Sequence, residues 1–132
     1  MTTTPRFPGS ELEAIDRAKI LGVRSGTTHK HTGVWVVVVE GRAFVRSWND
    51  KPTGWYRALR AEPHGSITIA GKRGEASREI AIRAIPLRSA RLRAAVTEAY
   101  AEKFDTPASQ KWVRGFAEPS REATTLELVP AT

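Results

Sequence analysis

The most constraining stretch of this 132-residue sequence is residues 31–40, HTGVWVVVVE. Tryptophan and valine are strong β-formers, and here they follow one another so closely that both faces of the strand would be apolar. A strand that is apolar on both faces needs cover on both sides, as inside a barrel or a sandwich. Gly41-Arg42 then predicts a tight turn, and residues 43–48 predict an antiparallel return strand.

In this hairpin, side chains alternate between the two faces of the strand. We therefore expect Val36 and Val38 on one face and Val37 and Val39 on the other. We also expect the return strand to pair with residues 34–39, and a helix anywhere in that range would contradict a barrel.

The rest of the chain alternates helices with short strands. Period-3.6 and period-2 patterns predict helices at 10–21, 55–60 and 90–104, a helical piece after Pro107, and strands at 23–24, 66–70, 78–85 and 124–129. Ser10 and Glu13 have the spacing of a capping box, and Ser89 can cap the longest helix. The order predicts an α+β fold on a small antiparallel barrel, with residues 1–9 as a flexible arm and 10–132 as one domain.

Composition narrows the function. The chain has no cysteine, so disulfides, thiolate metal sites and cysteine nucleophiles are excluded. The longest apolar run, 34–39, is too short to span a bilayer, and the N-terminus lacks a signal-peptide core, so we expect a cytoplasmic protein without a membrane partner. The formal charge of +7 favours anionic partners, although a generally basic surface explains it as well.

The stretch 44–63, FVRSWNDKPTGWYRALRAEP, is the candidate functional region. A strand runs into turn-forming residues, and a short helix then points its N-terminus back at that loop. Free backbone amides and the helix dipole at such a point suit an anion. Donors come from Ser47, Asn49, Lys51 and Arg57, and flat apolar surface comes from Trp48, Trp55 and Tyr56. Hydrogen-bond donors for a phosphate group, next to aromatic side chains, suit a flavin-like or nucleotide-like ligand.

The segment GWYRALRAEP, which follows a strand ending in VRS, resembles the split-barrel flavin and deazaflavin oxidoreductases. These are similar in fold to pyridoxamine-phosphate oxidase, and the closer similarity is to the deazaflavin-dependent nitroreductase branch. The positions that match are Ser47, Trp55, Tyr56, Leu59 and Pro63. Over residues 10–130 the chain also resembles a small bacterial family of unknown function in that superfamily, through YAEKF and KWVRGFAEP.

The resemblance implies a split β-barrel with flanking helices that binds FMN or a deazaflavin coenzyme and reduces small molecules. It also implies a homodimer whose interface completes the cofactor site. Tyr56 is the expected catalytic residue, as a proton donor or as a group that orients substrate. The cofactor-binding residues are then expected to be Thr32, Ser47, Trp48, Asn49, Lys51, Trp55, Tyr56 and Arg57.

Other functions stay open. The same cleft would also serve a non-redox module that holds a small anionic ligand or a protein partner. If no phosphorylated ligand binds, the stretch is structural, and Trp48, Trp55 and Tyr56 pack the barrel's end. A lesser alternative is nucleic-acid association through the arginines at 78, 83, 88, 91 and 93. His29 and His31 have the spacing of two metal ligands on one strand face, but without a third ligand we expect no metal.

Overall fold

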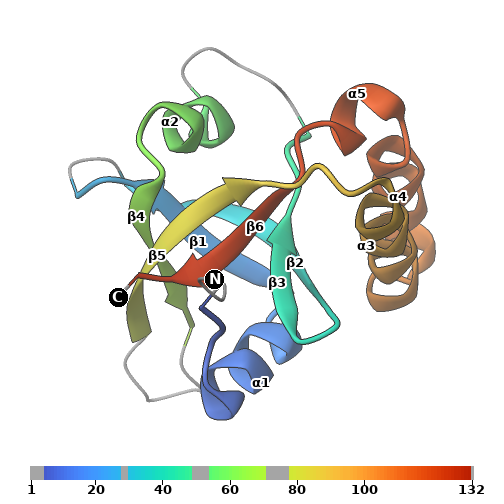
Figure 1. The fold of residues 1–132 in the computed structure, drawn as a ribbon. Helices are drawn as coiled ribbons and strands as arrows, with labels where there is room; N and C mark the ends of the chain where they lie inside the picture. The colour runs from blue at the N-terminus through green and yellow to red at the C-terminus, as the bar shows by residue number, and fades with distance from the viewer. Residues whose placement is uncertain (1–4, 28–29, 49–53, 71–77, 132) are drawn as a thin grey trace.

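The computed structural model describes residues 5–27, 30–48, 54–70 and 78–131. In these residues six antiparallel strands close into a barrel, in the order β1–β2–β3–β6–β5–β4 (Figure 1). The strands are β1 (Ile20–Ser25), β2 (Thr32–Val39), β3 (Arg42–Val45), β4 (His64–Ile69), β5 (Arg78–Pro86) and β6 (Leu126–Pro130). The helices are α1 (Gly9–Arg17), α2 (Trp55–Ala61), α3 (Ala90–Lys103), the 3-10 turn η1 (Pro107–Ser109), α4 (Gln110–Phe116) and α5 (Pro119–Glu122). The predicted α+β barrel with flanking helices is confirmed.

The β2–β3 hairpin forms as predicted, with Val36 paired to Val45 and Val37 to Phe44. Its turn lies one residue earlier than expected. Glu40 and Gly41 have φ of 53° and 75°, and two positive φ values are what a two-residue hairpin turn with the right twist requires. The return strand is also shorter than expected, because after Val45 the chain leaves the barrel.

The two apolar faces of β2 serve two different cores. Val36 and Val38 belong to the cluster inside the barrel, whereas Val37 and Val39 belong to a second cluster outside it. The second cluster joins the outer face of β2 and β3 to α3 and α4, through side chains such as Phe44. The face assignment read from the valine run is therefore confirmed.

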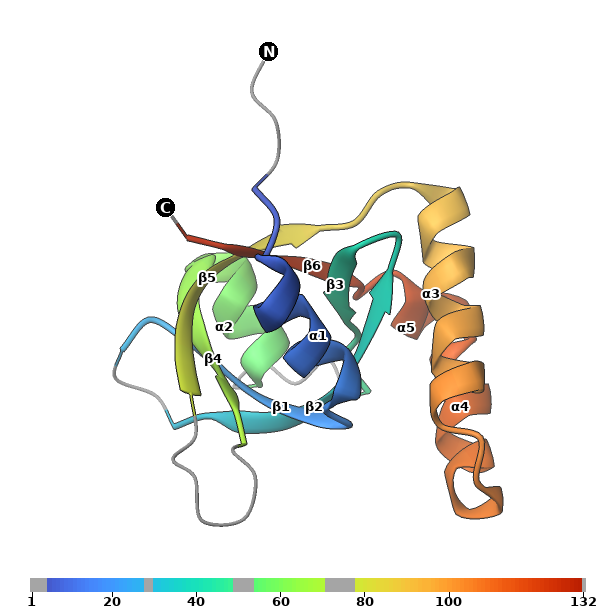
Figure 2. The ribbon, with the colours of Figure 1, turned by 90° about the horizontal axis from the view of Figure 1, so that it is seen from below.

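Helices α1 and α2 cover opposite ends of the barrel, and α3 and α4 pack along its side (Figures 1 and 2). Ile15 of α1 and Leu59 of α2 both enter the interior cluster. Phe7, in the segment expected to be an arm, packs in the same cluster. No helix in the described part of the chain has the length and apolar character needed to cross a membrane.

The first helix was predicted too long. It ends at Arg17, and Ile20 begins β1 opposite Trp35 of β2. Residues 20–21 are apolar enough for either structure, and pairing with β2 satisfies their backbone groups as strand. The capping box is also absent, because the N-cap is Pro8 and the Leu12 amide donates to the Pro8 carbonyl at 2.9 Å. Ser89 does cap α3, accepting from the Leu92 amide at 3.2 Å.

Candidate functional site

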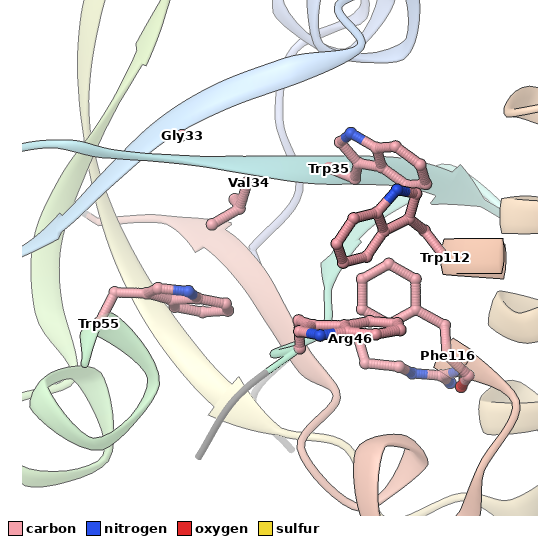
Figure 3. Close-up of a pocket in the computed structure, with 8 residues that line it drawn as sticks. Gly33, Val34, Trp35, Arg46, Trp55, Trp112 and Phe116 are labelled. Carbon is pink, nitrogen blue, oxygen red and sulfur yellow. Dashed lines mark hydrogen bonds between the residues drawn. The ribbon is translucent and has the colours of Figure 1, made fainter. Parts of the chain in front are cut away.

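All four tryptophans of the sequence line one cavity of about 380 Å³. The cavity lies between α2 and α4, where β2 begins and β3 has ended (Figure 3). Its volume is within the range of small-molecule sites. The lining residues are Gly33, Val34, Trp35, Arg46, Trp48, Trp55, Trp112 and Phe116.

Trp35 forms a fixed wall of this tryptophan cavity. Its ring stacks on Phe104 of α3, with centroids 4.0 Å apart and planes 3° apart. The Tyr100 hydroxyl donates to the Trp35 carbonyl oxygen at 2.9 Å. Burial raises the pKa of Tyr100, so the phenol stays protonated and keeps its role as a donor. One face of Trp35 is thus already covered by protein.

Several protein groups pack against the Trp48 ring. The Arg121 guanidinium lies 3.8 Å from its ring centroid, and Trp112 and Phe116 meet it edge-on at 4.6 and 5.6 Å. The ring also lies against the α4 backbone at Gly115, where an added Cβ would overlap the indole. A glycine at 115 is therefore what allows Trp48 to approach the helix this closely.

Trp55 and Trp112 stand on opposite sides of the cavity (Figure 3). Trp55 is the first residue of α2, and its ring approaches the Tyr56 ring edge-on, with centroids 6.3 Å apart. Trp112 of α4 is 40% exposed, one of two large hydrophobic side chains exposed in the described residues. Lys111 Nζ lies 5.2 Å from the Trp112 ring centroid, and Trp55 packs in part against the barrel core. Both indoles line the cavity and present surface there against which an aromatic ring can stack.

Arg46 also lines the cavity, and its side chain runs toward Phe116 (Figure 3). It is only 2% exposed. Nε donates to Thr125 Oγ1 at 2.8 Å, and Nη2 donates to the Arg93 carbonyl at 3.0 Å. Nη1 donates to both Thr97 Oγ1 and the Phe116 carbonyl at 2.7 Å. Burial lowers the pKa of Arg46, yet a guanidinium remains protonated at neutral pH.

The residues predicted from the sequence fall into separate places. Trp48 and Trp55 do meet at the tryptophan cavity. Thr32 lines a neighbouring cavity of about 150 Å³ that shares Trp55 as a wall. Ser47 is 1% exposed, and its amide donates to Thr124 Oγ1 at 2.9 Å. Asn49 and Lys51 lie outside the described residues.

Tyr56 and Arg57 line a third depression together with Arg60 and Ala61, and none of these four residues lines the tryptophan cavity. The Tyr56 hydroxyl accepts from Arg60 Nη1 at 2.8 Å, and its ring is 7% exposed as part of the barrel core. Trp48 and Trp55 thus line the same cavity, and Thr32 lines the neighbouring one. Tyr56 and Arg57 line a separate depression.

Comparison with known proteins places the chain in a family. Residues 11–128 match a family described as "Uncharacterized protein conserved in bacteria (DUF2255)". The chain belongs to DUF2255. No curated protein and no solved structure matches it. The bacterial family of unknown function expected from the sequence is therefore confirmed, at the level of an uncharacterized family.

Six cavity residues of this DUF2255 chain were not predicted as site residues: Gly33, Val34, Trp35, Arg46, Trp112 and Phe116. They come from β2, the end of β3, and α4, which are far apart in sequence. The sequence contained a sign of only one of these residues, Arg46. A charged residue inside the apolar run FVRSW is unusual, and Arg46 is indeed the largest fully buried side chain.

A polar cluster of the DUF2255 chain lies on the outer face of β1, β4 and β5. Ser66 Oγ accepts from Arg24 Nε at 3.1 Å and donates to Glu79 Oε2 at 2.9 Å, and His31 Nε2 lies 3.0 Å from it. Glu79 contacts the same His31 nitrogen, Nε2, at 3.3 Å, whereas the carboxylate of a hydrolase triad contacts Nδ1. His29 lies outside the described residues, within which no three potential metal ligands gather.

Proposed function

We propose that this chain binds a planar aromatic cofactor of the flavin or deazaflavin class in the tryptophan cavity. The observation that carries the proposal is the convergence of every tryptophan in the sequence on one cavity of about 380 Å³. The tryptophans come from β2, from the residues after β3, from α2 and from α4, so local sequence alone does not bring all four together. Aromatic walls suit a flat conjugated ring. The antiparallel barrel with flanking helices is compatible with a split barrel of the flavin-binding type.

The residues present fit such a ring. Trp55 and Trp112 would stack on it from two sides, while Trp35 and Trp48, held by Phe104 and Arg121, would fix the walls. Thr32, in the adjoining cavity, would contact a group that extends past Trp55. Ser47 and Lys51 remain the predicted phosphate-binding pair.

A bound flavin or deazaflavin supplies hydride transfer, and the protein then has to bind the ring, orient it and exclude water. Tyr56 remains the predicted catalytic residue in a reductase. Because its hydroxyl faces Arg60 in a separate depression, it would act on a substrate lying over α2. Without redox chemistry, the same cavity would serve as a module for a small anionic ligand, an alternative favoured by the buried Arg46 charge.

The proposal is tested by equilibrium dialysis of the purified protein against FMN and against a deazaflavin coenzyme, read by cofactor absorbance. We expect saturable binding of one of them. Trp112→Ala should weaken it by about tenfold or more, because stacking on an aromatic side chain contributes roughly 1–3 kcal/mol. Ile20→Ala is the matched control, since Ile20 is the other exposed large hydrophobic residue of the described chain and does not line the cavity. No saturable binding of either cofactor would contradict the proposal.

A further inference from the structure

One residue that lines the tryptophan cavity, Arg46, carries a buried positive charge. Each of the four hydrogen bonds from Arg46 ends on a neutral oxygen: two threonine hydroxyls and two backbone carbonyls. A guanidinium carries five N–H donors. Among the described residues no carboxylate lies within ion-pair distance of it, whereas Arg42 is paired with the buried Glu127 at 2.7 Å. The charge of Arg46 is thus hydrogen-bonded but not neutralised.

The charges around Arg46 do not cancel it. Tyr100, whose ring centroid lies 5.9 Å from the guanidinium carbon, and Glu122 attract the guanidinium without forming an ion pair, and Arg93 repels it. Arg121, over Trp48, is matched by Glu118 at 2.9 Å. Among the described residues that line the cavity, Arg46 is the one charged side chain, so the charge that a bound ligand meets from them is positive.

A charge that is buried without an ion-pair partner loses hydration and gains less Coulombic attraction in return than an ion pair would give. A ligand of opposite charge, held nearby in the same low-dielectric space, supplies that attraction, and salt screens it weakly because the pair is withdrawn from solvent. A neutral ring of the same shape gains the stacking alone.

We propose that the cavity selects a planar aromatic ligand with a negative charge on or beside its ring over a neutral ligand of the same shape. This selection rests on the proposed function, since it presupposes that the cavity takes up a flat ring. It narrows the ligand to an aromatic anion, such as an aromatic carboxylate or a ring system with an ionised position.

The test is calorimetric titration of the protein with 2-naphthoate and with 2-naphthamide, which share a ring system and differ in charge. We expect 2-naphthoate to bind about tenfold more tightly or better, a difference of about 1.4 kcal/mol. The preference should survive in about 0.5 M salt, where attraction to the basic surface is screened. In Arg46→Met the ratio should fall toward one, while Arg91→Gln, which removes an exposed cation paired with Glu40, should keep it.

The outcomes separate the two proposals. Equal binding of both probes overturns the charge selection and leaves aromatic binding standing, whereas binding of neither overturns both. A preference that disappears in about 0.5 M salt, or that is lost in Arg121→Gln and kept in Arg46→Met, also overturns the assignment to Arg46. Even if Arg46→Met does not fold, the salt series on the wild-type chain tests whether the preference comes from a buried charge or from the basic surface.

Discussion

Replacing Arg46 by lysine should destabilise the protein more than replacing it by methionine. Lysine keeps the buried charge, and methionine removes it. The wild-type guanidinium connects α3, α4 and the residue before β6, through acceptors on Thr97, Phe116 and Thr125. A single ammonium group cannot reach all of these acceptors, so the lysine charge would stay buried with fewer hydrogen bonds.

The magnitudes follow from the bonds each variant loses. A hydrogen bond from a charged donor contributes about 1.5–3 kcal/mol, so a lysine that loses two of the four should cost about 3–6 kcal/mol. After Arg46→Met, Thr125 Oγ1 still donates to the Glu122 carbonyl and Thr97 Oγ1 to the Arg93 carbonyl. The Phe116 carbonyl then loses its partner, at about 1–3 kcal/mol, while the cost of burying a charge is removed.

Urea unfolding followed by circular dichroism measures both variants against wild type. The lysine variant should be less stable than the methionine variant by roughly 2–3 kcal/mol. In a thermal melt, the midpoint temperatures of the two variants should differ by about 4 °C for each kcal/mol for a chain of this length. A lysine variant as stable as the methionine variant, or more so, would refute the idea that Arg46 is a buried charge without a counterion.

Other predictions concern the walls of the cavity, the outer polar cluster and assembly. Gly115→Ala should force Trp48 off α4 and weaken aromatic ligands, with an altered near-UV circular dichroism spectrum; an unchanged spectrum would count against the close approach. Tyr100→Phe should cost about 0.5–1.5 kcal/mol in urea unfolding, through the lost bond to the Trp35 carbonyl, and no measurable loss would contradict that bond. Burial and the Arg24 charge lower the pKa of His31, so the unfolded chain binds more protons near pH 6, and stability should fall as the pH drops below about 6.5; His31→Gln should flatten this slope, and an unchanged slope would be the contrary result. We also expect a homodimer in sedimentation at micromolar concentration, and a monomer alone would argue against a cofactor site completed at an interface.

Much of the barrel was predictable because its signals are local. The valine run 34–39 fixed which residues face which core, since alternation along a strand is strict. The error at Ile20 arose because two apolar residues after a helix fit either period, and the strand formed through pairing with Trp35, a partner 15 residues away. Local patterns do not report such pairing.

The site was predictable only where its residues are neighbours in sequence. Trp48 and Trp55 flank one loop, so one stretch contained both. Trp35 and Trp112 reach the cavity through the packing of α3 and α4 on the outside of β2, and Arg46 is buried by hydroxyls and carbonyls from α3, α4 and the segment before β6. These contacts depend on how the elements pack in three dimensions, which a single sequence does not show.

The most direct test of the tryptophan cavity uses the indole N–H signals of the ¹⁵N-labelled protein in two-dimensional NMR. The chain has four tryptophans, all lining the same cavity, so it should give four indole signals. On titration with FMN, a deazaflavin coenzyme or 2-naphthoate, we predict that all four signals shift together with a single dissociation constant. Four signals that stay in place at saturating concentrations of every ligand, or that shift with unrelated constants, would contradict a shared aromatic site.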